Sequence, residues 1–97
     1  MKLNPLRIFL AIVDTGSQHG AARALGLSQP AVTKALQRLE TDLDVRLFDR
    51  SVHGAELTEY GQALLVHARL VDAELKAGID TLNHIKGERA GSVSVAL

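Results

Sequence analysis

A proline-free stretch from Thr58 to Gly87 carries apolar side chains at spacings of three and four residues, which predicts one long helix. Thr58 is placed to cap its start, and Glu59 lies favourably at its positive end. About 28 helical residues at about 1.5 Å each extend about 42 Å, further than a core built from residues 1–57 can cover. The helix therefore needs a second apolar surface, and we expect a second copy of the chain to supply it. The apolar side chains that would face the second copy form a seam along the helix. This seam consists of Leu64, Ala68, Val71, Leu75, Ile79, Leu82 and Ile85.

The alternative for this segment is a helix that lies on a membrane surface. A membrane-surface helix is cationic, whereas the other faces of this one mix acidic and basic side chains: Asp72, Glu74, Asp80, Arg69, Lys76 and Lys86. The chain contains no run of about 18 apolar residues, the length needed to span a bilayer. Its start, MKLNPLR, does not resemble a signal peptide. We therefore favour a homodimer seam and expect no membrane partner.

The composition favours helix and argues against several classes of protein. Hydrophobic residues make up 46% of the 97 residues, which argues against disorder. Aromatic residues make up only 3% and the chain is rich in alanine and leucine, which favours a mainly α domain over a β-sandwich or barrel. The absence of cysteine excludes a disulfide scaffold and a thiolate metal site, and it fits the cytosol. The formal net charge is zero, so any affinity for nucleic acid must come from a local arrangement of side chains.

Three shorter helices are predicted before the long one. The first runs from about Pro5 to Asp14 after the N-cap Asn4, the second from about Gln18 to Leu25 after Ser17, and the third from Ser28 to about Leu43. Glycines Gly16 and Gly26 stop the first two helices, because glycine readily adopts the left-handed conformation. The short turn Gly26-Leu27-Ser28 between the second and third helices is typical of a helix-turn-helix.

The third helix has two different faces. Val32, Leu36, Leu39 and Leu43 form an apolar stripe that we expect in the core. The opposite face is polar and carries Pro30, Lys34, Gln37 and Thr41. The buried stripe should hold the helix while its first two turns offer hydrogen-bonding groups to a partner.

A two-stranded wing is predicted after the third helix. Val45–Arg50 and Glu56–Thr58 read as strands around His53-Gly54. At the other end of the chain, residues 87–91 read as a linker and residues 92–97 alternate like a buried strand with no sheet to join.

Four segments in this order, FLAIVDTGS, AARALGLSQPAVTKALQRLE, VRLFDR and LTEYGQALL, resemble the N-terminal part of LysR-type transcriptional regulators. The resemblance implies a winged helix-turn-helix DNA-binding domain over 1–58 and a linker or dimerisation helix over 59–87. Residues 88–97 would then be the hinge and first strand of an effector-binding domain. A small-molecule inducer would belong to that domain, and we expect no cofactor or metal in this part. His53 stands where the family's wing often carries arginine, and Glu56 stands where it often carries a basic or neutral residue.

Major-groove readout needs a helix whose exposed start offers polar and small apolar groups to base edges. Gln29 suits an adenine edge or a phosphate, Pro30 and the Thr33 methyl suit thymine methyl groups, and Lys34 suits guanine or backbone. Ser17 and Ser28, at two helix starts, suit phosphates, as do Arg38 and Arg50. These residues also have plainer interpretations. Residues 29, 30 and 33 are typical of a helix start, and Lys34 is a solvated charge. Arg38 pairs with Asp42 four residues on, and Arg50 forms an ion pair with Asp49 or Glu56.

His53 supports a sharper hypothesis beside its plain interpretation as a loop residue without a role. Histidine changes charge between about pH 5 and 8, so an imidazole near phosphates would strengthen DNA binding as the pH falls from about 7.5 to 6. The remaining histidines, His19, His67 and His84, read as surface residues without metal-ligand spacing. No nucleophile elbow or phosphate loop is present, so we predict that the chain is not an enzyme.

Together these features predict sequence-specific binding of double-stranded DNA by a homodimer on a pseudo-palindromic operator. The helix at about 28–42 would enter the major groove and the wing would lie at the minor groove. A full-length tetramer located in the cytoplasm, at the nucleoid, follows from the resemblance. The alternative is a winged-helix module that serves protein assembly without binding DNA.

Overall fold

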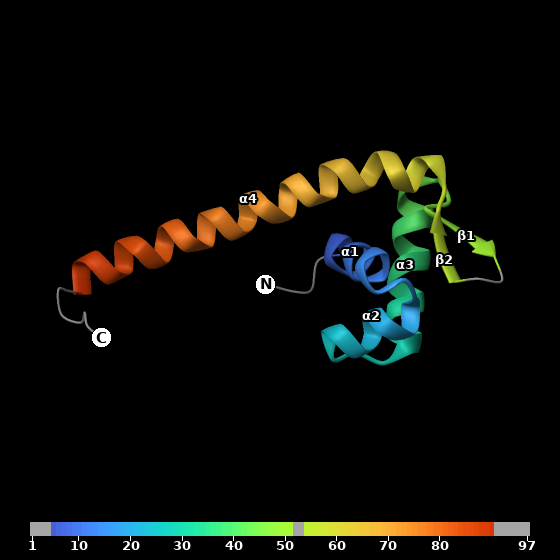
Figure 1. Cartoon of the computed structure of the whole chain (residues 1–97), viewed down its shortest axis with the longest axis horizontal. Helices are drawn as coiled ribbons and strands as arrows, with labels where there is room; N and C mark the ends of the chain where they lie inside the picture. The colour runs from blue at the N-terminus through green and yellow to red at the C-terminus, as the bar shows by residue number, and fades with distance from the viewer. Residues whose placement is uncertain (1–4, 52–53, 91–97) are drawn as a thin grey trace.

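The computed structural model describes residues 5–51 and 54–90, and it confirms a mainly α winged helix-turn-helix followed by a long helix. The elements are α1 (Pro5–Thr15), α2 (Gln18–Leu25), α3 (Gln29–Leu43), β1 (Phe48–Ser51), β2 (Gly54–Leu57) and α4 (Glu59–Ala90). The first three helices and the two strands cluster at one end, and α4 extends away from them (Figure 1). The molecule is accordingly elongated, with dimensions of 55 × 25 × 21 Å.

The predicted caps set the boundaries of α2 and α3. The Ser17 hydroxyl oxygen accepts the Gly20 N–H at 2.9 Å, and that of Ser28 accepts the Ala31 N–H at 3.2 Å. Gly26 ends α2 in the left-handed region with φ 69° and donates its N–H to the last turn of that helix. The helix-turn-helix geometry is therefore produced by local chemistry at the positions where the sequence predicts it.

The core lies where α1, α2 and α3 meet the start of the wing. Phe9, Ile12, Val32 and Leu47 are the largest fully buried side chains, and the Phe9 and Phe48 rings lie 5.4 Å apart between centroids. Leu36 is buried and Leu39 half-buried, as the apolar stripe of α3 predicts. Leu43 is 45% exposed, which corrects its assignment to the core: it lies at the last residue of α3, beyond the elements that cover the stripe.

The strands of the wing have other bounds than the sequence predicts: β1 begins and ends later, at Phe48 and Ser51, and β2 begins earlier, at Gly54 instead of Glu56. β1 and β2 pair antiparallel, with Phe48 opposite Leu57 and Asp49 opposite Glu56. The first strand begins at Phe48 instead of Val45, because a side chain satisfies the backbone before it. The Glu40 carboxylate accepts the Leu47 N–H at 2.7 Å.

Thr58 is the cap of α4 and not the last residue of a strand. Its hydroxyl donates to the Arg46 carbonyl at 2.5 Å and its oxygen accepts the Gly61 N–H at 3.1 Å. The helix then continues through Gly87 to Ala90 instead of ending at Gly87. In the described part of the chain, no helix is both long and apolar enough to cross a membrane.

Candidate nucleic-acid interface

The first two turns of α3 present an exposed polar surface. Gln29, Pro30 and Lys34 are exposed and Thr33 is half-buried. Together with Gln37 they line a shallow hollow of about 620 Å³. Val32 on the other side of the same turns is fully buried, so the core fixes the direction in which this surface faces.

Lys34 and Arg38 are unpaired cations on α3. Both side chains are exposed, and neither forms an ion pair within residues 5–51 and 54–90. Arg38 therefore does not make the pair with Asp42 that was its plainer interpretation. Both charges are available to an anionic partner.

The two serine caps leave a donor at each helix start. Ser17 is half-buried and Ser28 is exposed. Each hydroxyl oxygen accepts a backbone N–H within its own helix, but the hydroxyl proton is not used in that bond. Each serine can cap its helix and donate to an anion at the same time, so the predicted phosphate contacts are compatible with the capping role.

Gln18, which the sequence analysis did not single out, contacts the exposed face of α3. The Thr33 hydroxyl donates a hydrogen bond to Gln18 Oε1 at the first residue of α2. The two residues lie 15 positions apart, and no helical or strand periodicity connects such a pair. Only the angle between α2 and α3 brings them together.

The wing carries two carboxylates face to face. Asp49 and Glu56 are directly opposite each other in the hairpin register, and both are exposed. Like charges at such positions repel. Arg50 lies in β1 opposite Ala55, while His53 lies outside the described residues.

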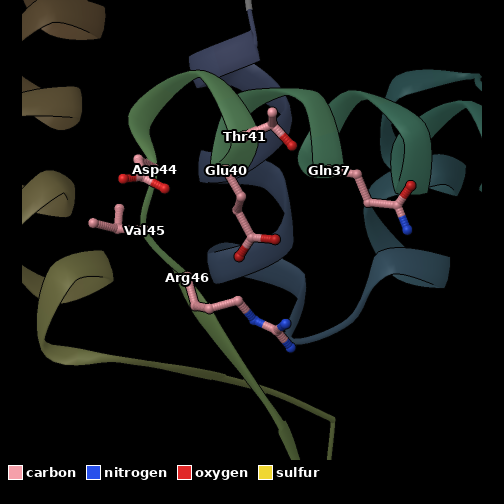
Figure 2. Close-up of a pocket in the computed structure, with 6 residues that line it drawn as sticks. All are labelled: Gln37, Glu40, Thr41, Asp44, Val45 and Arg46. Atoms are coloured by element: carbon pink, nitrogen blue, oxygen red, sulfur yellow. The ribbon is translucent and has the colours of Figure 1, made fainter.

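A second hollow lies at the other end of α3. It has a volume of about 440 Å³ and is lined by Gln37, Glu40, Thr41, Asp44, Val45 and Arg46. Figure 2 shows the Glu40 side chain extending from α3 toward the segment that carries Arg46. The Glu40 carboxylate is engaged with the backbone N–H groups of Leu47 and Phe48, so its role is to join α3 to the wing.

The predicted seam of α4 divides into two parts. Ala68 is only 1% exposed in the single chain and belongs to the core, which corrects its assignment to the dimer surface. Leu64 also packs against the core, and Leu75 is half-buried. Val71, Ile79, Leu82 and Ile85 are exposed, and the last three of them lie beyond Leu75 along the helix.

Ion pairs hold the covered part of α4 against α1. Arg69 Nη2 donates to Asp14 Oδ1 at 2.9 Å, and Arg7 Nη2 lies 3.8 Å from Asp72 Oδ1. Val66 and Leu70, both 60% exposed, lie outside the predicted seam. The contacts between α4 and α1 depend on the direction in which α4 leaves the wing. The spacing of apolar residues along the helix does not reveal that direction.

Residues 3–62 match the model of a family described as bacterial regulatory helix-turn-helix protein, lysR family. The chain belongs to the LysR family. An uncharacterized HTH-type transcriptional regulator of Azotobacter vinelandii is 41% identical over 96 residues, which cover 99% of this chain and 67% of that protein. The HTH-type transcriptional regulator GbpR of Azospirillum brasilense is 38% identical over 95 residues, covering 98% of this chain but only 28% of GbpR.

Solved structures of LysR-type proteins have the same fold. The CbnR_DBD–DNA complex matches with a TM-score of 0.77 and 36% identity, covering 89% of this chain and 99% of that one. The BenM_DBD/catB site 1 DNA complex matches with a TM-score of 0.83 and 26% identity, covering 90% of this chain and 98% of that one. Full-length CbnR, a LysR family transcriptional regulator, matches over 95% of this chain but only 30% of its own length.

LysR-family membership confirms the resemblance, the winged helix-turn-helix and the prediction that the chain is not an enzyme, since the family consists of regulators. The match ends at residue 62, so it covers all of α3 and the wing but only the start of α4. The roles of individual side chains in binding and dimerisation remain predictions.

Proposed function

We propose that this chain is the DNA-binding part of a bacterial transcription regulator and that it binds double-stranded DNA with sequence specificity. The first two turns of α3 enter the major groove, and the wing lies at the minor groove. The observation that carries the proposal is the exposed surface formed by Gln29, Pro30, Thr33 and Lys34 on a helix whose opposite side is buried. CbnR_DBD and BenM_DBD, which share the fold, were crystallised with DNA, and this supports the proposal.

The side chains of this surface suit the chemistry of the major groove. Gln29 can pair with an adenine edge or bond a phosphate, and Lys34 can reach guanine or phosphate. Pro30 supplies an apolar contact for a thymine methyl group. Ser17 and Ser28 lie at helix N-termini, where the hydroxyl proton, free backbone N–H groups and the helix dipole favour a phosphate.

Dimerisation is the second part of the proposal. The exposed seam residues of α4, Val71, Ile79, Leu82 and Ile85, would pack against a second copy. The two copies of α3 would then read half-sites one helical turn or a multiple of it apart on pseudo-palindromic DNA. The wider regulator would carry an effector domain with its inducer, assemble as a tetramer, and act in the cytoplasm at the nucleoid.

A protein-assembly module that does not bind DNA is the other candidate. The zero net charge and the acidic Asp49–Glu56 pair on the wing favour it, because both lower the attraction to phosphates. Lys34 and Arg38, which are exposed and form no ion pair within the described part of the chain, favour DNA. We therefore place DNA binding first.

A salt titration separates the two candidates. The chain is titrated with a duplex that it selects from a random pool and with a scrambled duplex, at increasing salt concentration. DNA binding predicts that log affinity falls with log salt with a slope near −0.9 per neutralised phosphate. Binding to neither duplex, or affinity without salt dependence, would support the assembly module.

Matched lysine variants localise the binding. Lys34→Ala should weaken binding and reduce the magnitude of the salt slope by about 1. Lys86→Ala removes another exposed lysine from the far half of α4 and should leave the slope unchanged. Equal effects of the two variants would contradict the placement of α3 at the DNA.

A further inference from the structure

The Thr33 hydroxyl has a different kind of hydrogen-bond acceptor from the hydroxyls of Thr15 and Thr81, which also lie in helices. The Thr15 hydroxyl donates to the Ala11 carbonyl at 2.7 Å, and the Thr81 hydroxyl donates to the Ala77 carbonyl at 3.0 Å. Both bonds reach four residues back along the same helix. The Thr33 hydroxyl instead donates to Gln18 Oε1 on α2.

This difference concerns the rotamer of the side chain. Helical threonine divides between two χ1 rotamers because its hydroxyl can bond a carbonyl three or four residues earlier. For Thr33 the carbonyl four residues earlier is that of Gln29, at the start of the same surface. The bond to Gln18 takes the hydroxyl proton that such a bond would use, and it favours the rotamer in which the hydroxyl reaches α2.

We infer that Gln18 is a positioning residue that holds Thr33 in one rotamer, so that Thr33 meets DNA with its methyl group and not as a hydrogen-bond donor. A threonine hydroxyl has a single proton, and the bond to Gln18 uses it. Thr33 lines the hollow over α3, and both partners of the bond are half-buried. The inference rests on the proposed function, which brings DNA to this surface.

The base that such a methyl group distinguishes is thymine. Thymine alone presents a C5 methyl group in the major groove. We therefore expect one thymine of the preferred duplex to contact Thr33. The strength of this contact should depend on Gln18, although Gln18 lies on a different helix.

The DNA test uses the duplex selected by the wild-type chain and a series in which each thymine in turn is replaced by deoxyuridine. For the wild type, one replacement should lower the affinity about threefold to tenfold. Thr33→Val should keep this penalty, because valine retains a methyl group and holds one rotamer in a helix. Gln18→Leu should reduce the penalty at least twofold in the wild-type background and leave it unchanged in the Thr33→Val background.

A measurement on the free chain tests the positioning without DNA. Three-bond scalar couplings to the Thr33 methyl group should report a single rotamer in the wild type and an average of rotamers in Gln18→Leu. Gln18→Glu should restore the single rotamer, because a carboxylate still accepts the hydroxyl proton. Circular dichroism checks that each variant keeps its helices.

The outcomes separate this inference from the proposed function. Averaged couplings in the wild type would overturn the positioning whether or not DNA binds. An unchanged deoxyuridine penalty in Gln18→Leu, or the same reduction in the Thr33→Val background, would overturn the methyl contact while leaving DNA binding intact. Failure of the wild type to select any duplex would overturn the proposed function and the methyl contact, and the couplings would still decide the positioning.

Discussion

Gly61 lies at a close approach of α4 to the wing. A Cβ atom at this position would lie 2.2 Å from the Leu47 carbonyl oxygen and 2.6 Å from Leu57 Cδ2. The same carbonyl oxygen accepts the Thr58 N–H at 3.0 Å, so it cannot retreat without loss of that bond. Gly61→Ala should therefore force α4 away from the hairpin.

Gly78→Ala is the matched control on the same helix. A Cβ atom at Gly78 meets nothing within 4 Å, so the substitution should leave the free energy of unfolding unchanged or raise it by up to about 1 kcal/mol, the helix propensity gained. Overpacking in a well-packed site costs about 1–3 kcal/mol. Because the obstructing atom is backbone, we expect Gly61→Ala to be less stable than Gly78→Ala by an amount near the upper end of that range.

Urea unfolding followed by circular dichroism measures the difference. The midpoint of Gly61→Ala should fall below that of Gly78→Ala with a similar slope, since the surface exposed on unfolding is nearly the same. Equal midpoints would refute the close packing of α4 on the wing.

Glu56, Glu40 and Leu82 lie on the wing, in α3 and on α4, and a substitution of each has its own measurable effect. Glu56→Gln should raise affinity for duplex DNA about twofold to fivefold at low salt, because it removes one of the two opposed wing carboxylates. Fluorescence anisotropy measures the affinity, and an unchanged value would place the wing away from the phosphates. Glu40→Gln should lower the free energy of unfolding by about 1–2 kcal/mol, because the Glu40 carboxylate accepts two backbone N–H groups. A urea midpoint equal to that of the wild type would contradict this role. Leu82→Asp alters a side chain that is 62% exposed and should split the dimer without unfolding the winged domain; an unchanged sedimentation mass would count against the seam.

The features that the sequence predicts well are determined by neighbouring residues. Ser17 and Ser28 cap helices, and Gly26 ends one, through atoms only a few positions away. The apolar spacing of Val32 and Leu36 likewise identifies the buried side of α3, and with it the exposed side. The candidate surface can therefore be found from local chemistry.

The features that the sequence analysis missed depend on how distant elements pack. The Thr33–Gln18 bond needs the angle between α2 and α3, and the burial of Ala68 needs the path of α4 beside α1. The shorter first strand depends on Glu40, whose carboxylate takes the backbone donor of Leu47. In each case a tertiary contact overrides or adds to a pattern that spacing alone can describe.

The proposed function requires that the exposed start of α3 contacts the bases of DNA. Titration of the isotope-labelled chain with its selected duplex, followed through backbone amide shifts, tests this claim most directly. We predict that the largest shifts occur at Ser17, at Ser28 and Gln29, and from Ala31 to Lys34, since Pro30 has no amide proton, with little change from Ile79 to Lys86. Shifts concentrated on α4, with the start of α3 unaffected, would contradict it.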